Sequence, residues 1–240
     1  MKPAILALVL LAVSNTFPSA QAAEKTLWDS WYTVTVGGKT HYGYYNDKVT
    51  QADGKIRFQN QFWKQEEGYI NEEQLGAIAD DNAELTPVFF SFRSNYRAAE
   101  LVIDGNVSGK VLTVKIRKAK AELPPIRKTL PSKAVLSIYF PVLAAKKLTG
   151  MKVGDGAAFL AVLEDNIDLA YRAVDGKMKV EKPDAFALKS HTAKVSVTYS
   201  DRRSVWYLEP SGNAVRIEMP DQNTVVERVP QSQAKNFLGE

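Results

Sequence analysis

The residues that could do chemistry are few and lie far apart in this sequence. There are only two histidines, His41 and His191, and there is no cysteine. Neither histidine has a second metal ligand or a catalytic partner at helical or strand spacing. A Ser-His-Asp triad stays open, because its members need not be adjacent in sequence, although no Gly-x-Ser-x-Gly elbow occurs. The absence of cysteine excludes disulfides, cysteine nucleophiles, zinc ribbons and iron–sulfur clusters.

Acidic pairs offer a second kind of chemistry. Two carboxyl groups can hydrolyse a glycoside if they face each other across a cleft. Acidic residues can also bind calcium, but none of these pairs has the spacing of a calcium-binding loop. The favoured interpretation is that they lie in turns. The pairs are Glu66-Glu67, Glu72-Glu73, Asp80-Asp81 and Glu164-Asp165, the last with Asp168 close by.

The segment from Gly105 to Lys110 invites comparison with a phosphate-binding loop. Its spacing is one residue short, and Val111 stands where a Ser or Thr would bind magnesium. A strand pattern follows it, so we predict a hairpin turn over 105–109. We therefore predict no cofactor and no metal.

The aromatic residues are the more informative group. Adjacent pairs such as Trp31-Tyr32, Phe62-Trp63 and Phe89-Phe90 would place large apolar groups on both faces of a strand. The second face could pack on a helix or another sheet, or it could form a concave apolar surface that holds an acyl chain. The candidate ligand-binding residues on such a surface are Trp31, Phe58, Phe62, Phe90 and Phe92.

The elements that must position these residues are mostly β-strands. Residues 28–65 predict three antiparallel strands, joined by turns at Gly37-Gly38 and at 52–54. Further strands follow, including one with Ile167, Leu169 and Tyr171 and a hairpin turn at Asp175-Gly176. With roughly ten to twelve short strands, the pattern is typical of all-β proteins. We predict a mainly β fold, a long curved antiparallel sheet forming a half-barrel or open barrel.

One helix interrupts this pattern in mid-chain. Ser132 is a candidate N-cap for an amphipathic helix from Lys133 to Lys147, in which Pro141 would cause a kink or a division into two short helices. Such a helix would cover the open side of the sheet. We predict one β-rich domain over 23–240. An alternative division into halves 24–122 and 132–240 follows from the prolines between them.

The N-terminus has the pattern of an export signal. Lys2 precedes a short apolar run over 4–13, and Ala20-Gln21-Ala22 matches a signal-peptidase site, which predicts a cleaved signal peptide over 1–22. The run is shorter than the about 20 residues that span a bilayer, and no later stretch is long enough. We predict no transmembrane span and a periplasmic location, with an extracellular one as the alternative.

The chain has a net charge of +4, and its positive and negative residues are interspersed along the sequence. There is no dense basic stripe of the kind that binds nucleic acid, so we predict no nucleic-acid partner.

Several segments together resemble uncharacterised bacterial periplasmic proteins whose shape is similar to the lipoprotein-carrier (LolA-like) half-barrel. The resemblance implies a long antiparallel meander curled around a helix; carrier activity does not follow from shape. The segments are 31–38, Gly43-Tyr44, Leu85-Thr86-Pro87, 104–109 and 151–155.

The functional hypothesis is a non-enzymatic exported protein that binds a hydrophobic or amphiphilic envelope component in its curved sheet. One alternative is a structural or interaction module that contacts another envelope protein. The other is a hydrolase of envelope glycans or esters, with His41 or an acidic pair in its site.

Overall fold

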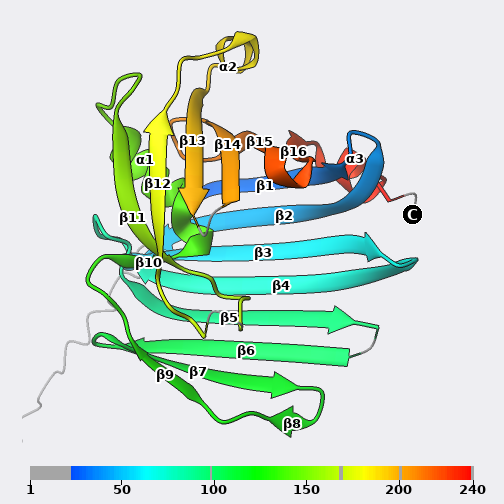
Figure 1. Ribbon diagram of the computed structural model, residues 1–240, viewed down its shortest axis with the longest axis vertical. Helices are drawn as coiled ribbons and strands as arrows, with labels where there is room; N and C mark the ends of the chain where they lie inside the picture. The colour runs from blue at the N-terminus through cyan, green and yellow to red at the C-terminus, as the bar shows by residue number, and fades with distance from the viewer. Residues whose placement is uncertain (1–22, 98, 168–169, 200–201, 239–240) are drawn as a thin grey trace, which may run out of the picture.

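The computed structural model describes residues 23–97, 99–167, 170–199 and 202–238, and their strands form one continuous sheet (Figure 1). The strand order is β10-β11-β12-β13-β14-β15-β16-β1-β2-β3-β4-β5-β6-β7-β8, and β9 pairs with β7. Neighbours are antiparallel except β10 and β11, which are parallel. The predicted mainly β, antiparallel fold is therefore confirmed, and the sheet is open.

The described residues of the first half form nine strands. Their bounds are β1 (Lys25–Val36), β2 (Thr40–Ala52), β3 (Lys55–Glu66), β4 (Tyr69–Asp80), β5 (Pro87–Tyr96), β6 (Ala99–Ser108), β7 (Val111–Lys118), β8 (Ala121–Glu122) and β9 (Ile126–Thr129). The second half forms seven more, interrupted by helices. These strands are β10 (Ala134–Leu136), β11 (Gly156–Val162), β12 (Val174–Val180), β13 (Ala193–Tyr199), β14 (Arg202–Leu208), β15 (Ala214–Met219) and β16 (Thr224–Val229).

The register assigns each face of the sheet, because residues directly opposite on neighbouring strands point to the same side. Tyr32 of β1 pairs with Tyr45 of β2, which pairs with Phe62 of β3. These residues lie on the inner, concave face. Their neighbours in sequence, such as Trp31 and Asn46, lie on the outer face.

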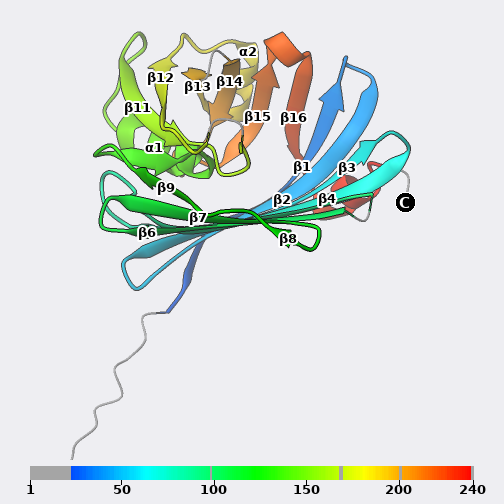
Figure 2. The same ribbon diagram turned by 60° about the horizontal axis from the view of Figure 1, so that its bottom comes forward.

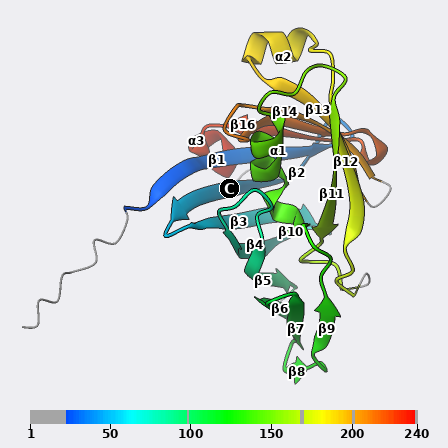
Figure 3. The ribbon, with the colours of Figure 1, turned by 90° about the vertical axis from the view of Figure 1, so that its left-hand side faces the viewer.

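The sheet bends so that its two halves face each other, and helix α1 (Phe140–Leu148) lies inside the bend (Figures 2 and 3). Residues 140–144 of α1 are all buried. A single hydrophobic cluster includes α1 and strands from both halves of the chain. The central helix is therefore confirmed, and it fills part of the concavity.

The helix is shorter than the predicted segment from Lys133 to Lys147. Residues 134–136 instead form β10, and a 3-10 turn, η1 (Ser137–Tyr139), leads into α1. Pro141 lies in the first turn of α1, where its missing N–H costs nothing, so it begins the helix rather than kinking it. Ser132 does not cap the helix; its hydroxyl accepts a hydrogen bond from Lys110.

Two further short helices were not predicted, α2 (Ala185–Ser190) and α3 (Gln231–Lys235). Both are too short for a clear helical period in sequence. Among the described residues, no helix has the length and apolar character needed to cross a membrane. The predicted signal peptide over 1–22 lies outside the described residues.

Two glycine-based turn predictions were wrong for the same reason. Gly176 lies within β12 and Gly105 within β6, so neither makes a hairpin; the turn falls at Gly109 instead. A Cβ on Gly105 would lie 2.1 Å from the ring of Phe90, and a Cβ on Gly176 would lie 2.3 Å from the ring of Phe159. These glycines make room for rings from the neighbouring strand.

The strand predicted around Ile167 and Tyr171 is also wrong. The described residues from 163 to 173 form no strand, and Leu169 lies outside the described part. Tyr171 has a left-handed backbone and is buried against the core, near Phe90. The alternation of Ile167 and Tyr171 therefore does not mark a strand; it falls in a loop from which the Tyr171 side chain is buried in the core.

Candidate functional site

Two cavities lie on the inner face of the sheet beside η1 and α1. The first has a volume of about 260 Å³ and the second of about 610 Å³. Both are lined by Asn60, Ser137, Ile138 and Tyr199. Because they share these wall residues, we treat them as two parts of one hollow, and it is the candidate site.

Aromatic residues make up half of the residues that line the first cavity. Tyr32 and Tyr45 stack with ring centroids 4.7 Å apart. Phe140, from α1, meets Trp206 of β14 at 5.0 Å, so rings from both halves of the sheet and from the helix converge here. The aromatic wall residues are Trp28, Tyr32, Tyr45, Phe58, Phe140, Tyr199 and Trp206.

Hydrogen bonds fix several of these groups in place. The Tyr32 hydroxyl donates to the side chain of Asn213 at 2.7 Å, and Asn213 in turn donates to Ser30 at 3.0 Å. On the helix side, the Tyr139 hydroxyl donates to the carbonyl of Ile56 at 2.8 Å, which ties η1 to β3. Buried, satisfied hydrogen bonds of this kind hold the wall in one arrangement.

Asp47 is the charged group in this aromatic wall. It lies on β2, on the same face as Tyr45, and its Oδ1 accepts a hydrogen bond from Asn60 at 2.7 Å. Removal from water raises the pKa of Asp47 to about 7, while the hydrogen bond from Asn60 opposes that rise. The group therefore changes charge near neutral pH.

The second cavity has a more polar and more acidic wall. Its charged wall residues are Glu73, Glu164, Asp165 and Arg202. Glu73 forms an ion pair with Lys64 at 2.9 Å.

Glu164 is buried and holds the turn that precedes α1. Its carboxylate accepts hydrogen bonds from the Ser137 hydroxyl at 2.6 Å and from the Ile138 N–H at 3.1 Å. Burial raises the pKa of Glu164 to about 7, against these hydrogen bonds. The carboxyl group that the sequence placed in a turn therefore anchors the helix segment to the cavity wall.

Four of the five predicted ligand-binding residues lie on the inner face. Phe58 lines the first cavity and Phe92 lines the second. Phe62 packs against Tyr45 next to them, and Phe90 is fully buried in the core over Gly105. The structure thus brings Phe58 and Phe92 to the hollow, while Phe62 and Phe90 support its walls.

Trp31 lies on the opposite, outer face. Its ring stacks on Trp63 at 6.0 Å, and Trp63 stacks on Tyr44 at 4.9 Å. The Nζ atom of Lys235, from α3, lies 5.3 Å from the centre of the Trp31 ring. These outer-face rings stack on one another. The adjacent pairs Trp31-Tyr32 and Phe62-Trp63 therefore place one ring on the outer face and one ring on the inner face of the sheet.

The histidines take part in local packing. Nδ1 of His41 is 2.9 Å from the carbonyl oxygen of Phe237, on which the ring also stacks. His191 ends α2 in a left-handed conformation. Across the described ranges, neither histidine contacts an acidic side chain, and no group of three potential ligands could hold a metal ion.

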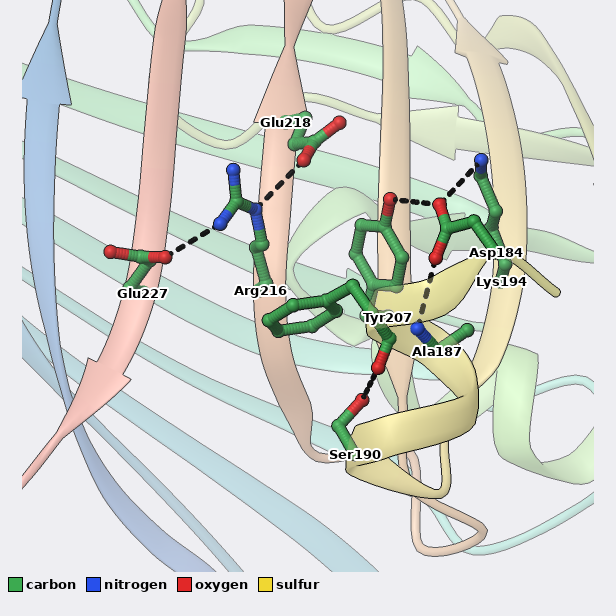
Figure 4. Close-up of polar contacts among 9 residues, drawn as sticks. Asp184, Ala187, Ser190, Lys194, Tyr207, Arg216, Glu218 and Glu227 are labelled. Atoms are coloured by element: carbon green, nitrogen blue, oxygen red, sulfur yellow. Dashed lines mark hydrogen bonds and ion pairs between the residues drawn. The ribbon is translucent and has the colours of Figure 1, made fainter. Parts of the chain in front are cut away.

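A second polar cluster lies on the outer face around α2 (Figure 4). Asp184 caps α2 by accepting from the N–H of Ala187 at 2.9 Å, and it also accepts from Lys194 at 2.8 Å and from the Tyr207 hydroxyl at 2.9 Å. These bonds lower the pKa of Asp184, the Lys194 contact most of all. Every group in this cluster has a structural partner, so we assign it to stability.

The sequence predictions missed much of the hollow. Trp28 lies on the same face of β1 as Tyr32, and Tyr45 lies opposite Tyr32 on β2. Following the strand register from Tyr32 would have found both residues. Trp206 and Phe140 come from distant parts of the chain, and no local pattern connects them to β2. Asp47 gave no signal because it stands between polar residues in the sequence.

Comparisons with known proteins place the chain in no family. No family model matches it, and no curated protein matches it. One solved structure, a crystal structure of a DUF1089 family protein from Pseudomonas aeruginosa, matches with 12% identity and a TM-score of 0.44. The match covers 77% of this chain and 92% of that one.

Proposed function

We propose that this protein binds a small hydrophobic or amphiphilic molecule in the hollow between its bent sheet and α1. The observation that carries the proposal is a pair of adjoining cavities of about 260 and 610 Å³, the first rich in aromatic rings and the second lined largely by polar and charged groups. Small-molecule sites are typically about 300–1,000 Å³, mainly apolar and aromatic, with a few placed polar groups. The first cavity has this composition, and the second adds a polar end to the hollow, which suits an amphiphilic ligand.

The export signal predicted over 1–22 suggests where the ligand would come from. A protein that leaves the cytoplasm of a bacterium meets the lipids, acylated peptides and glycans of the envelope. We therefore propose a periplasmic protein that binds an amphiphilic envelope component. This location is an inference from residues 1–22, with the extracellular medium as the alternative.

Ligand-dependent stabilisation tests the proposal. The chain from residue 23, stripped of lipid, is incubated with an organic extract of bacterial envelopes, and its thermal midpoint and native mass spectrum are recorded. A ligand that binds only the folded state adds about 2.7 kcal/mol to the free energy of unfolding when its concentration is one hundred times its Kd. The thermal midpoint rises as a result. The bound molecule is expected as a discrete mass increment.

A cavity-filling variant makes the test specific. Ile138 lines both cavities, so Ile138→Trp is expected to fill the hollow and to weaken binding at least about tenfold. The matched control is Leu188→Trp, which adds the same side chain at an exposed position of α2. An unchanged midpoint with every extract fraction, or equal binding by both variants, contradicts the proposal.

An interaction module remains the second candidate. The hairpin between β3 and β4 exposes Tyr69 and Ile70, which are 56% and 44% exposed, at its tip. Exposed apolar residues on a hairpin tip favour a protein contact. A stoichiometric envelope partner that is lost with Tyr69→Ser and Ile70→Ser, and kept with Ile138→Trp, would favour this candidate over ligand binding.

A further inference from the structure

We propose that the ligand carries a cationic nitrogen, an amine or a quaternary ammonium group, which rests against Asp47. This inference depends on the binding function proposed above and names the chemical class of the ligand. Three observations carry it: an Asp47 carboxylate without a counter-charge, the rings that surround it, and the sign of the charges in the adjoining cavity.

The first observation is that Asp47 lacks a cationic partner. Its hydrogen bond comes from Asn60, a neutral amide, at 2.7 Å. In the described part of the chain, no Lys or Arg nitrogen lies within ion-pair distance of its carboxylate. Asp47 is half-buried, and a half-buried carboxylate with no cation beside it in a ligand-sized hollow marks the position of a charge that the ligand would supply.

The second observation is the identity of the groups around it. Tyr45 is the next residue on this face of β2, and Tyr32 stacks on Tyr45. Burial raises the pKa of both hydroxyls, so the two tyrosines stay neutral at physiological pH. The nearest cation that acts on Tyr32 within the described residues, Arg228, is paired with Glu209 at 2.6 Å. Aromatic faces attract cations, and rings combined with a carboxylate are the usual way in which proteins bind quaternary ammonium groups.

The third observation is the charge of the second cavity. Three carboxyl groups, those of Glu73, Glu164 and Asp165, line it beside one cation, Arg202. Glu73 is already paired with Lys64, so the excess negative charge comes from Glu164 and Asp165 and is fully present above pH 7, where Glu164 is ionised. The whole chain has a net charge of +4, so this acidic wall departs from the average surface. A carboxylate or phosphate head group would meet like charges here, whereas a cation would be attracted.

The experiment compares head groups on one constant tail. Decyltrimethylammonium, decylamine, decanoate and decyl maltoside, each below its micelle concentration, are titrated into the lipid-stripped chain. Binding is followed by calorimetry and by the fluorescence of the native tryptophans, two of which, Trp28 and Trp206, line the hollow. We expect the two cationic ligands to bind at least about tenfold more tightly than decanoate at pH 8.

Two variants isolate the contribution of Asp47. Asp47→Asn keeps the shape and is expected to remove the preference for cations while leaving decyl maltoside binding within about twofold. The matched control is Asp29→Asn: Asp29 pairs with Lys48 on the outer face of the same two strands, and its carboxylate is exposed. This control is expected to bind all four ligands like the unmodified chain.

A pH series provides a readout that does not depend on the folding of a variant. Since the pKa of Asp47 is raised to about 7, a cation that pairs with its carboxylate must displace a proton in acidic solution. Cation binding should therefore weaken about tenfold from pH 8 to pH 6, whereas decyl maltoside binding should not change. In calorimetry, the released protons should make the measured enthalpy of cation binding vary with the ionisation enthalpy of the buffer.

Each outcome has one meaning. Binding of all four ligands with equal affinity, or a preference for decanoate, overturns the cationic ligand and leaves the binding function intact. If the preference for cations persists in Asp47→Asn, another group is responsible for that preference, and the inference is also overturned. Failure of every ligand, together with no stabilisation by envelope extracts, overturns the proposed binding function itself.

Discussion

At the scale of single residues, the inner face is built by matching large rings with glycines on the next strand. Phe90 lies over Gly105, Phe159 lies over Gly176, and a Cβ on Gly43 would lie 2.6 Å from the ring of Phe62. Each ring gains contact area because its neighbour has no side chain. The cost is a weaker local strand propensity, which the buried aromatic surface offsets.

This arrangement makes Gly105→Ala a destabilising change. The added methyl group would collide with Phe90, which is fully buried and cannot move without disturbing the core. We expect a loss of about 1–3 kcal/mol in the free energy of unfolding, as for other overpacked cores. Urea denaturation followed by fluorescence measures it.

The control is Gly76→Ala in β4, where nothing lies within 4 Å of the added Cβ. It has an ordinary strand conformation, so the change should be neutral or slightly stabilising. Equal losses for both variants would show that strand glycines matter here for the backbone and not for the rings.

At the scale of elements, one side chain, Asp184, makes most of the polar contacts that attach α2 to the sheet. The helix has six residues, too few to be stable by itself. Asp184 caps it and joins it to β13 through Lys194 and to β14 through Tyr207. Phe186 adds an edge contact with the ring of Tyr207 at 4.8 Å.

We therefore expect Asp184→Ala to cost about 1–2 kcal/mol, mostly through the lost cap, because the partly exposed ion pair with Lys194 adds little. The pKa of Asp184 is lowered on folding, so its ionised form stabilises the protein above its ordinary pKa, about 3.9, and this contribution is lost as the pH falls below that value. The difference between the two proteins should thus shrink from pH 6 to pH 2.

Asp184→Asn separates the two contributions in the same urea titrations. The amide oxygen can still accept from the Ala187 N–H, so most of the stability should return, without the pH dependence. A difference between Asp184→Ala and the unmodified chain that stays constant with pH would contradict the assignment.

At the scale of the whole molecule, the first and last strands meet in the middle of the sheet. β1 pairs with β16 over residues 31–36 and 224–229, so the two halves of the chain join along a central seam. The hydrophobic cluster also continues across it. The single domain predicted over 23–240, with halves 24–122 and 132–240 as the alternative, stays a prediction that unfolding experiments on this seam can test.

The expected consequence is one cooperative unfolding transition. Fluorescence and far-ultraviolet circular dichroism should give coincident urea curves, and the calorimetric and van't Hoff enthalpies should agree. A chain limited to residues 24–122 should not fold, because its inner face loses β16 and α1. Two resolved transitions, or a folded fragment, would instead support the division at the proline segment.

The sequence was sufficient for the antiparallel meander, because strand alternation and glycine turns are local properties that each segment carries by itself. Tyr32, Phe58 and Phe92 were assigned to strands in this way, and the central helix was found from its apolar residues, although its start was wrong. Gly105 and Gly176 were wrongly assigned to turns, because glycine is found both in turns and at strand positions where a neighbouring ring needs space.

The tertiary structure alone decided which rings share a face with a cavity. Trp31 and Tyr32 are neighbours in the chain, but the pleat sends them to opposite sides of the sheet, and only the bend of the sheet makes one side concave. Trp206, Phe140 and Asp47 come together because the chain folds β14 and α1 over β2, a long-range arrangement that local patterns do not encode.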